Sequence, residues 1–190
     1  MKILVFNVGS SSLKFGVFDP ALDDSRLFKG EFENFHANGS VLHYRYGGEH
    51  GVEKNRNEAA PDLRAAIAKV QAILDEFGYA NFQAVGHRVV HGGTQFRGPT
   101  LINAEVINRI SDCAALAPLH NPLALLGINK SRELWPSLPQ VAVFDTAFIR
   151  VFLIIHTHMR FPDSGESMVC VATGSKARRI TMLHYVLRMP

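Results

Sequence analysis

Cysteine is scarce in this chain of 190 residues, which contains only Cys113 and Cys170. The two cysteines have no CxxC spacing and no secretory context, so the sequence favours free thiols over a disulfide framework or a zinc site. Long apolar runs are lacking too. Residues 151–155 form a run far shorter than the roughly 20 residues that span a bilayer, and residues 3–6 are too few for the apolar part of a signal peptide. We therefore expect a soluble cytoplasmic protein with no membrane partner.

A basic surface suited to nucleic acid is also lacking, although the net charge is +3. Residues 150–190 contain six Lys/Arg and two Asp/Glu, a net charge of +4, whereas the remainder contains 14 and 15, a net charge of −1. Phosphate-backbone binding needs cations gathered on a folded face, and an excess confined to the last fifth of the chain is weak support for it. We expect no nucleic-acid partner.

Short segments with aromatic or β-branched residues, punctuated by Gly, Asn and Asp, predict strands at residues 2–8, 13–18, 26–33 and 40–46. Two later segments, 82–90 and 141–144, also have strand character. Helical periodicity predicts a helix over residues 61–77, a second from Asn103 to about residue 115, and a third that begins at Asn121-Pro122 and stops near Pro136. Strands followed by alternating helices and strands indicate an α/β fold, a sheet with flanking helices.

A turn between the first two predicted strands contains groups that suit an anion. Gly9 and the hydroxyls of Ser10, Ser11 and Ser12 can face phosphate oxygens, with Lys14 adding a positive charge. The spacing is not that of a Walker A loop, because a strand follows in place of a helix. An ordinary serine-rich hairpin is the alternative.

A second polar group lies at the end of the predicted strand 82–90. Arginine's planar fork suits a carboxylate or phosphate, and Arg88 shares a strand face with the apolar Val90. A short carboxylic acid would need such a pair, a cation for its carboxylate and an apolar wall for its alkyl group. A surface ion pair beside a tight turn is the alternative.

Two more candidates stand at element ends. His120 and a capping asparagine, Asn121, precede a helix whose N-terminus attracts anions, and Asp145 follows a buried strand. A structural histidine and a turn-forming aspartate are the alternatives. Because ligands of α/β sheets bind where strands end, we expect these polar groups to share one edge of the sheet. No Gly-x-Ser-x-Gly elbow is present, which disfavours a serine hydrolase that uses Ser10 to Ser12.

Four segments together resemble the signature segments of the acetate kinase family. They are NVGSSSLK at residues 7–14, GHRVVHGG at 86–93, residues 116–122 and VFDTAF at 143–148. Four independent matches in the expected order make the resemblance specific over residues 1–148. It implies the N-terminal domain of an actin-like, sugar-kinase (ribonuclease H-like) fold with a mixed sheet, incomplete here. Propionate and butyrate kinases have similar segments.

The resemblance also implies roles for the matching positions. Asn7 matches an asparagine at the magnesium and phosphate site, and Ser10, Ser12 and Lys14 match groups of the phosphate loop. Arg88 matches the arginine that holds the acyl carboxylate, while Val90 and Leu119 match walls of the pocket for its methyl group. His120 matches a histidine that faces the transferring phosphoryl group, and Asp145 matches the catalytic aspartate.

The implied reaction is reversible, Mg²⁺-dependent transfer of the γ-phosphoryl group of ATP to acetate, which gives acetyl phosphate and ADP. ATP and Mg²⁺ are therefore the expected cofactors, and acetate or another short-chain carboxylate the expected partner. The family is dimeric. Propionate or butyrate kinase activity is the alternative within the family, and a non-catalytic anion-binding remnant is the alternative outside it.

The family pattern ends after residue 148. Residues 149–183 lack the expected Gly-Phe-His-Gly-Thr-Ser-His segment, yet His184-Tyr185-Val186 resembles the family again. Such an interval is typical of a stretch read in a shifted frame. We expect an acetate-kinase-like domain over residues 1–148, a poorly ordered aberrant tail over 149–190, and little kinase activity from this chain alone.

Overall fold

The structure is a computed structural model that describes residues 1–22, 26–35, 40–48 and 51–147. The predicted tail, residues 149–190, lies outside these ranges. None of the helices in the described ranges is long and apolar enough to cross a membrane. The elements are β1 (Ile3–Val8), β2 (Ser12–Phe18), β3 (Arg26–Glu33), β4 (Val41–Tyr46), β5 (Val52–Asn57), α1 (Leu63–Glu76), β6 (Ala84–Val89), β7 (Thr100–Leu101), α2 (Ala104–Asp112), the 3₁₀ helix η1 (Cys113–Leu116), α3 (Asn121–Leu134) and β8 (Gln140–Phe144).

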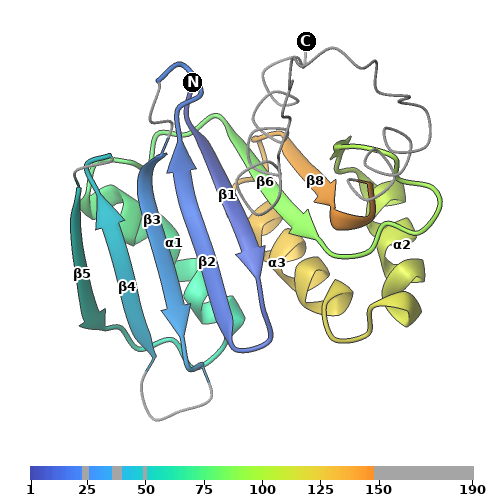
Figure 1. Cartoon of the computed structure of the whole chain (residues 1–190), viewed down its shortest axis with the longest axis horizontal. Helices are drawn as coiled ribbons and strands as arrows, with labels where there is room; N and C mark the ends of the chain where they lie inside the picture. The colour runs from blue at the N-terminus through green and yellow to red at the C-terminus, as the bar shows by residue number, and fades with distance from the viewer. Residues whose placement is uncertain (23–25, 36–39, 49–50, 148–190) are drawn as a thin grey trace, which may run out of the picture.

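The described strands form one mixed sheet of eight strands in the order β5-β4-β3-β2-β1-β6-β8-β7. Strand β6 lies parallel to β1 on one side and to β8 on the other, and the remaining pairs are antiparallel. Figure 1 shows α1 and α3 on one side of this sheet, α1 behind the antiparallel strands and α3 behind β6. The mixed sheet with flanking helices agrees with the predicted fold class.

Most predicted elements are present, and two strands were missed. The segments predicted at 2–8, 13–18, 26–33, 40–46, 82–90 and 141–144 correspond to β1, β2, β3, β4, β6 and β8. Strand β5 contains one apolar residue in VEKNRN, so it has no strand periodicity of its own. Its pairing with β4 in a hairpin makes it a strand. Strand β7 is only two residues long, which is too short for a sequence pattern to predict it.

Side-chain caps and a glycine fix the helix boundaries. The carboxylate of Asp62 accepts a hydrogen bond from the backbone N–H of Ala65 at 2.8 Å, so α1 begins at Leu63, after the predicted start. Gly78, with φ +73°, follows its end in a conformation that favours glycine. The predicted cap Asn103 is confirmed, since its side chain accepts from Val106 N–H at 2.9 Å.

Two apolar clusters lie between the helices and the sheet. The larger joins the helix-facing side chains of β1 to β4 to one face of α1, and the smaller joins α2 and α3 to β8. Phe6 on β1 belongs to the larger cluster, and its ring stacks on Trp135, just after α3, at 6.1 Å and on His87 of β6 at 5.8 Å. Strand alternation then places Asn7 and Arg88, the next residues, on the opposite face.

Helix α3 packs closely on β1 through Gly127. A Cβ at this position would lie 2.9 Å from Cγ2 of Val8, closer than carbon atoms normally approach. Because a glycine inside a helix costs about 1 kcal/mol relative to alanine, its presence here is best explained by this close approach. The contact sets how near the middle of α3 lies to the strand that contains Asn7.

Replacing Gly127 with valine should destabilise the chain by about 1–3 kcal/mol, since overpacking forces α3 away from β1. Gly98 is a matched control, because nothing lies within 4 Å of a Cβ built there and its φ is not positive. Gly98→Val should change the free energy of unfolding by about 0.5 kcal/mol or less. Urea unfolding of both variants measures the difference, and equal stabilities would contradict the close packing.

Candidate active site

The three parallel strands end at the same edge of the sheet, where Arg88 and Asp145 meet. Nε of Arg88 donates to both carboxylate oxygens of Asp145 at 3.1 Å, and Nη2 donates to Oδ2 at 2.6 Å. Arg88 is the penultimate residue of β6, and Asp145 follows β8 directly. The side chain of Asp145 is 14% exposed and that of Arg88 38% exposed. This two-point contact fixes the plane of the guanidinium.

Asn7 completes the cluster from β1. Its Oδ1 accepts a hydrogen bond from Nη1 of Arg88 at 3.0 Å. An arginine has five N–H donors, and the bonds to Asp145 and Asn7 use three of them. One N–H on each terminal nitrogen therefore has no partner among the described residues. These two N–H groups, on a half-exposed cation, can donate to a ligand carboxylate without displacing Asp145.

Lys14 lies beside Asn7, because the two residues are cross-strand partners on β1 and β2. Its ammonium does not contact the Arg88 cluster in the described part of the chain. It forms an ion pair with Glu31 of β3, with 2.7 Å between Nζ and Oε1. Three predicted residues, Asn7, Lys14 and Arg88, thus form a row across neighbouring strands.

The predicted phosphate loop is the turn between β1 and β2. The N–H of Gly9 donates to the carbonyl of Ser12 at 2.8 Å, which closes the turn. Ser10 is exposed and Ser12 half-buried, and their hydroxyls have no hydrogen bond within the described residues. The geometry leaves these hydroxyls available to a ligand, and gives them no adjacent base that would support a serine hydrolase.

The loop after β6 is tied to α3 and to β8 through its backbone. The side chain of Asn121, which is fully buried, accepts from the N–H of His91 at 3.2 Å and donates to its carbonyl at 2.8 Å. The N–H of Gly92 donates to Oγ1 of Thr146 at 3.1 Å. Sequence reasoning missed these contacts, which couple the start of α3 and the residue after Asp145 to one loop.

The prediction that Asn121 caps α3 is wrong. The cap is His120, and it makes no side-chain capping bond. Pro122 occupies the first turn, and the Asn121 side chain is turned inward to the backbone of His91, so it cannot cap its own helix. A single sequence contains no signal for this, because the partner lies 30 residues away.

The remaining predicted residues lie around the start of α3 and the end of β6. His120 is exposed, Leu119 is 73% exposed, and Val90 is half-buried just beyond β6. None of the three has a hydrogen bond or ion pair between its side chain and the Arg88 cluster in the described residues. Their roles in a methyl pocket and at a phosphoryl group remain predictions.

His87, next to Arg88, points to the other side of the sheet and is neutral. Burial lowers its pKa to about 4 from the ordinary 6.5, and a 2.9 Å hydrogen bond between Nε2 and Oε1 of Gln140 opposes this shift only in part. A neutral imidazole stacked on Phe6 supports the strand beneath Arg88 without adding charge to the site.

Comparison with known proteins identifies the family. A family model described as the acetokinase family matches residues 2–157. The chain belongs to this family. It is 47% identical over 169 residues to an acetate kinase of Clostridium botulinum and 45% identical over 169 residues to one of Clostridium acetobutylicum; each match covers 86% of this chain and 39% of that protein.

Solved structures of acetokinase-type enzymes share the fold. An acetate kinase of Porphyromonas gingivalis superposes with a TM-score of 0.69 at 36% identity, covering 77% of this chain and 38% of that chain. A propionate kinase of Francisella tularensis gives a TM-score of 0.68 at 39% identity, over 77% of this chain and 37% of that one. The predicted fold class, an α/β N-terminal domain with a mixed sheet and flanking helices, is confirmed. This acetokinase chain spans about two fifths of the length of its relatives.

The buried His87 makes stability depend on pH. In the unfolded chain this imidazole gains a proton near pH 6.5, whereas in the folded chain it stays neutral down to about pH 4. Acid therefore favours the unfolded state, and the contribution of His87 is lost as the pH falls through this window. The stability difference between the native chain and His87→Gln should shrink by about 2–3 kcal/mol from about pH 7.5 to about pH 4.5.

Urea unfolding at both pH values measures that difference. His43→Gln is the control, because the side chain of His43 is 47% exposed on β4. The stability difference between the native chain and the variant should change less with pH for His43→Gln than for His87→Gln. A difference for His87→Gln that does not change with pH would mean that His87 is not held neutral in the folded chain.

Proposed function

We propose that this chain carries the acyl-binding and phosphate-binding part of an acetate kinase, which reversibly transfers the γ-phosphoryl group of ATP to acetate. The observation that supports it most is the Arg88 cluster, in which Asp145 and Asn7 orient the guanidinium and leave one N–H on each terminal nitrogen without a partner in the described residues. A small carboxylate matches these two donors. Membership of the acetokinase family supports the same chemistry.

In the proposed reaction, Arg88 holds and orients the carboxylate of acetate. One acetate oxygen forms a bond to the γ-phosphorus, the bond from that phosphorus to the bridging oxygen breaks, and ADP leaves with the electron pair. No proton has to be removed from a carboxylate nucleophile. Asp145 therefore acts by fixing Arg88 and the site around it, and general-base chemistry is not required of it.

The phosphate side of the site consists of Lys14, the Ser10 and Ser12 hydroxyls and His120. Lys14 stands one strand from Asn7, and the turn hydroxyls have no protein partner in the described residues. His120 is exposed at the N-terminus of α3, where the helix dipole favours negative charge. Together these groups would offset the charge that develops on the transferred phosphoryl oxygens.

Magnesium fits this site as an ion that the nucleotide carries. The described residues contain no group of three or more His, Cys, Asp or Glu side chains that could hold a metal. Asn7 offers an amide oxygen and Asp145 a carboxylate, and Mg²⁺ is often bound by one or two such groups plus substrate phosphates. When bound, the ion would neutralise phosphate charge, and Asn7 and Asp145 would face it.

We further propose that this chain alone transfers phosphoryl groups slowly. It contains no Gly-Phe-His-Gly-Thr-Ser-His segment, and each lost electrostatic donor typically costs about 10²–10³ in rate. A propionate kinase activity is the second candidate, supported by the likeness to the Francisella tularensis enzyme. Val90 and Leu119 would decide between the acyl groups. Dimerisation and a cytoplasmic location remain predictions.

Acetate binding by the full chain tests the proposal without requiring turnover. Arg88→Gln removes the cation. The affinity of this variant for acetate, measured by ligand-observed NMR titration, should be at least about tenfold lower than that of the native chain, as expected for a lost charged hydrogen bond. Arg109→Gln is the matched control, since Arg109 is an exposed arginine on α2 paired with Glu105 and Gln95. Its affinity should match that of the native chain. Equal affinities for all three chains, or no acetate binding by the native chain, would overturn the proposal.

A further inference from the structure

Lys14 already has an anionic partner within the protein. Its Nζ lies 2.7 Å from Oε1 of Glu31, and the two residues stand directly opposite each other on β2 and β3. The side chain of Lys14 is 48% exposed, whereas that of Glu31 is 13% exposed. The carboxylate is thus the fixed member of the pair, and the flexible, half-exposed lysine is the member that can move.

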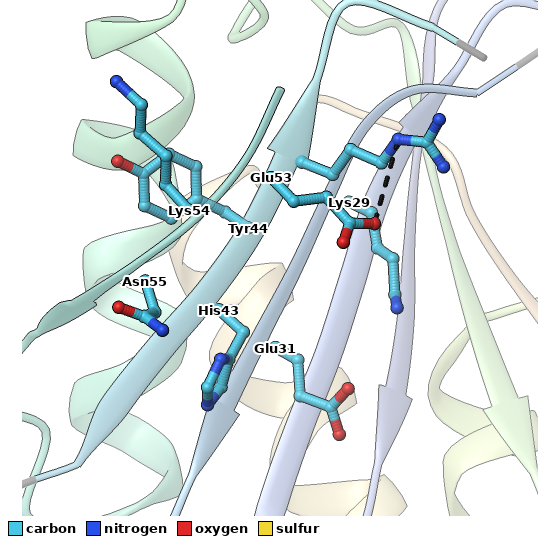
Figure 2. A pocket seen from close by; sticks show the side chains of 8 residues that line it. Lys29, Glu31, His43, Tyr44, Glu53, Lys54 and Asn55 are labelled. Atoms are coloured by element: carbon cyan, nitrogen blue, oxygen red, sulfur yellow. Dashed lines mark ion pairs between the residues drawn. The ribbon is translucent and has the colours of Figure 1, made fainter. Parts of the chain in front are cut away.

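Other charges on this face of the sheet do not replace Lys14 as the partner of Glu31. Figure 2 shows Glu31 and His43 side by side on neighbouring strands, along a hollow of about 240 Å³ over β3 to β5. His43 is 3.6 Å from Glu33, and Arg45 is 3.9 Å from Glu53. In the described residues, Lys14 is the cation that forms an ion pair with Glu31.

A carboxylate this close partly neutralises the ammonium and competes with any other anion for it. A phosphate oxygen that approaches Lys14 meets an ammonium whose charge Glu31 already partly offsets. Because β2 lies between β1 and β3, the pair also draws the ammonium toward β3, on the side of β2 away from Asn7. Glu31 thereby sets both where Lys14 is and how available its charge is.

We propose that Glu31 is a positioning residue that holds the ammonium of Lys14 on the β3 side, away from Asn7, and competes with a phosphoryl group for its charge. The inference rests on the proposed function, which gives Lys14 its phosphate. Glu31 itself does not touch the substrate. Its effect on phosphate affinity acts through Lys14, so it should vanish when Lys14 is removed.

Glu31→Gln keeps the shape of the side chain and removes its charge. This variant should bind inorganic phosphate about two- to fivefold more tightly than the native chain, the range that corresponds to a partly exposed ion pair. In a Lys14→Met background the same substitution should leave the affinity unchanged. The four affinities form a double-mutant cycle that isolates the pair, and a ¹⁵N-labelled chain titrated with phosphate reports them through the amide signals of residues 9–14.

Glu53→Gln is the matched control, because Glu53 lies on the same face of the sheet and its substitution changes the net charge equally. It is paired with Arg45 on β4 and stands three strands from Lys14. A gain in affinity for Glu31→Gln that exceeds the gain for Glu53→Gln and requires Lys14 would support the inference. Equal gains, or a gain that persists without Lys14, would overturn it while the proposed function stands. If neither the native chain nor Glu31→Gln binds phosphate, the phosphate site of the proposed function fails together with this inference.

Discussion

The hydrogen-bonded contact between Arg88 and Asp145 is the interaction on which the candidate site depends. It exists because β6 runs parallel to β1 and β8, so the ends of three strands from distant parts of the chain meet. Asn7 contributes from the first of these strands and Asp145 from just beyond the last. The parallel sheet thus brings Asn7 and Asp145, which are 81 and 57 positions from Arg88 in the sequence, into contact with it.

Backbone ties hold the surrounding loop in place. Asn121 clamps the peptide groups of His91 from the start of α3, and Thr146 accepts the N–H of Gly92 next to Asp145. Gly127 brings the same helix against β1. Leu119 and His120 therefore directly precede a helix whose start is tied to the loop after Arg88.

The sequence was a good guide wherever the signal is local. Asn103 was predicted as a cap and is one, and Arg88 and Asp145 were expected at one sheet edge because both end strands. Strand β5 could not be predicted, because only its pairing with β4 makes it a strand. Asn121 was misassigned and Glu31 overlooked for the same physical reason. Their partners are set by tertiary contacts and by strand register, which no single-sequence pattern encodes.

Both cations of the predicted site are paired with carboxylates, Arg88 with Asp145 and Lys14 with Glu31. Arginine has five N–H donors and lysine three, so each cation can still donate to a further anion. A crystal structure of this chain with acetate tests the central claim most directly. We predict that the acetate carboxylate lies within hydrogen-bond distance of the terminal nitrogens of Arg88 while Asp145 stays bound to Nε. Acetate bound elsewhere, with these two donors facing solvent, would contradict the account.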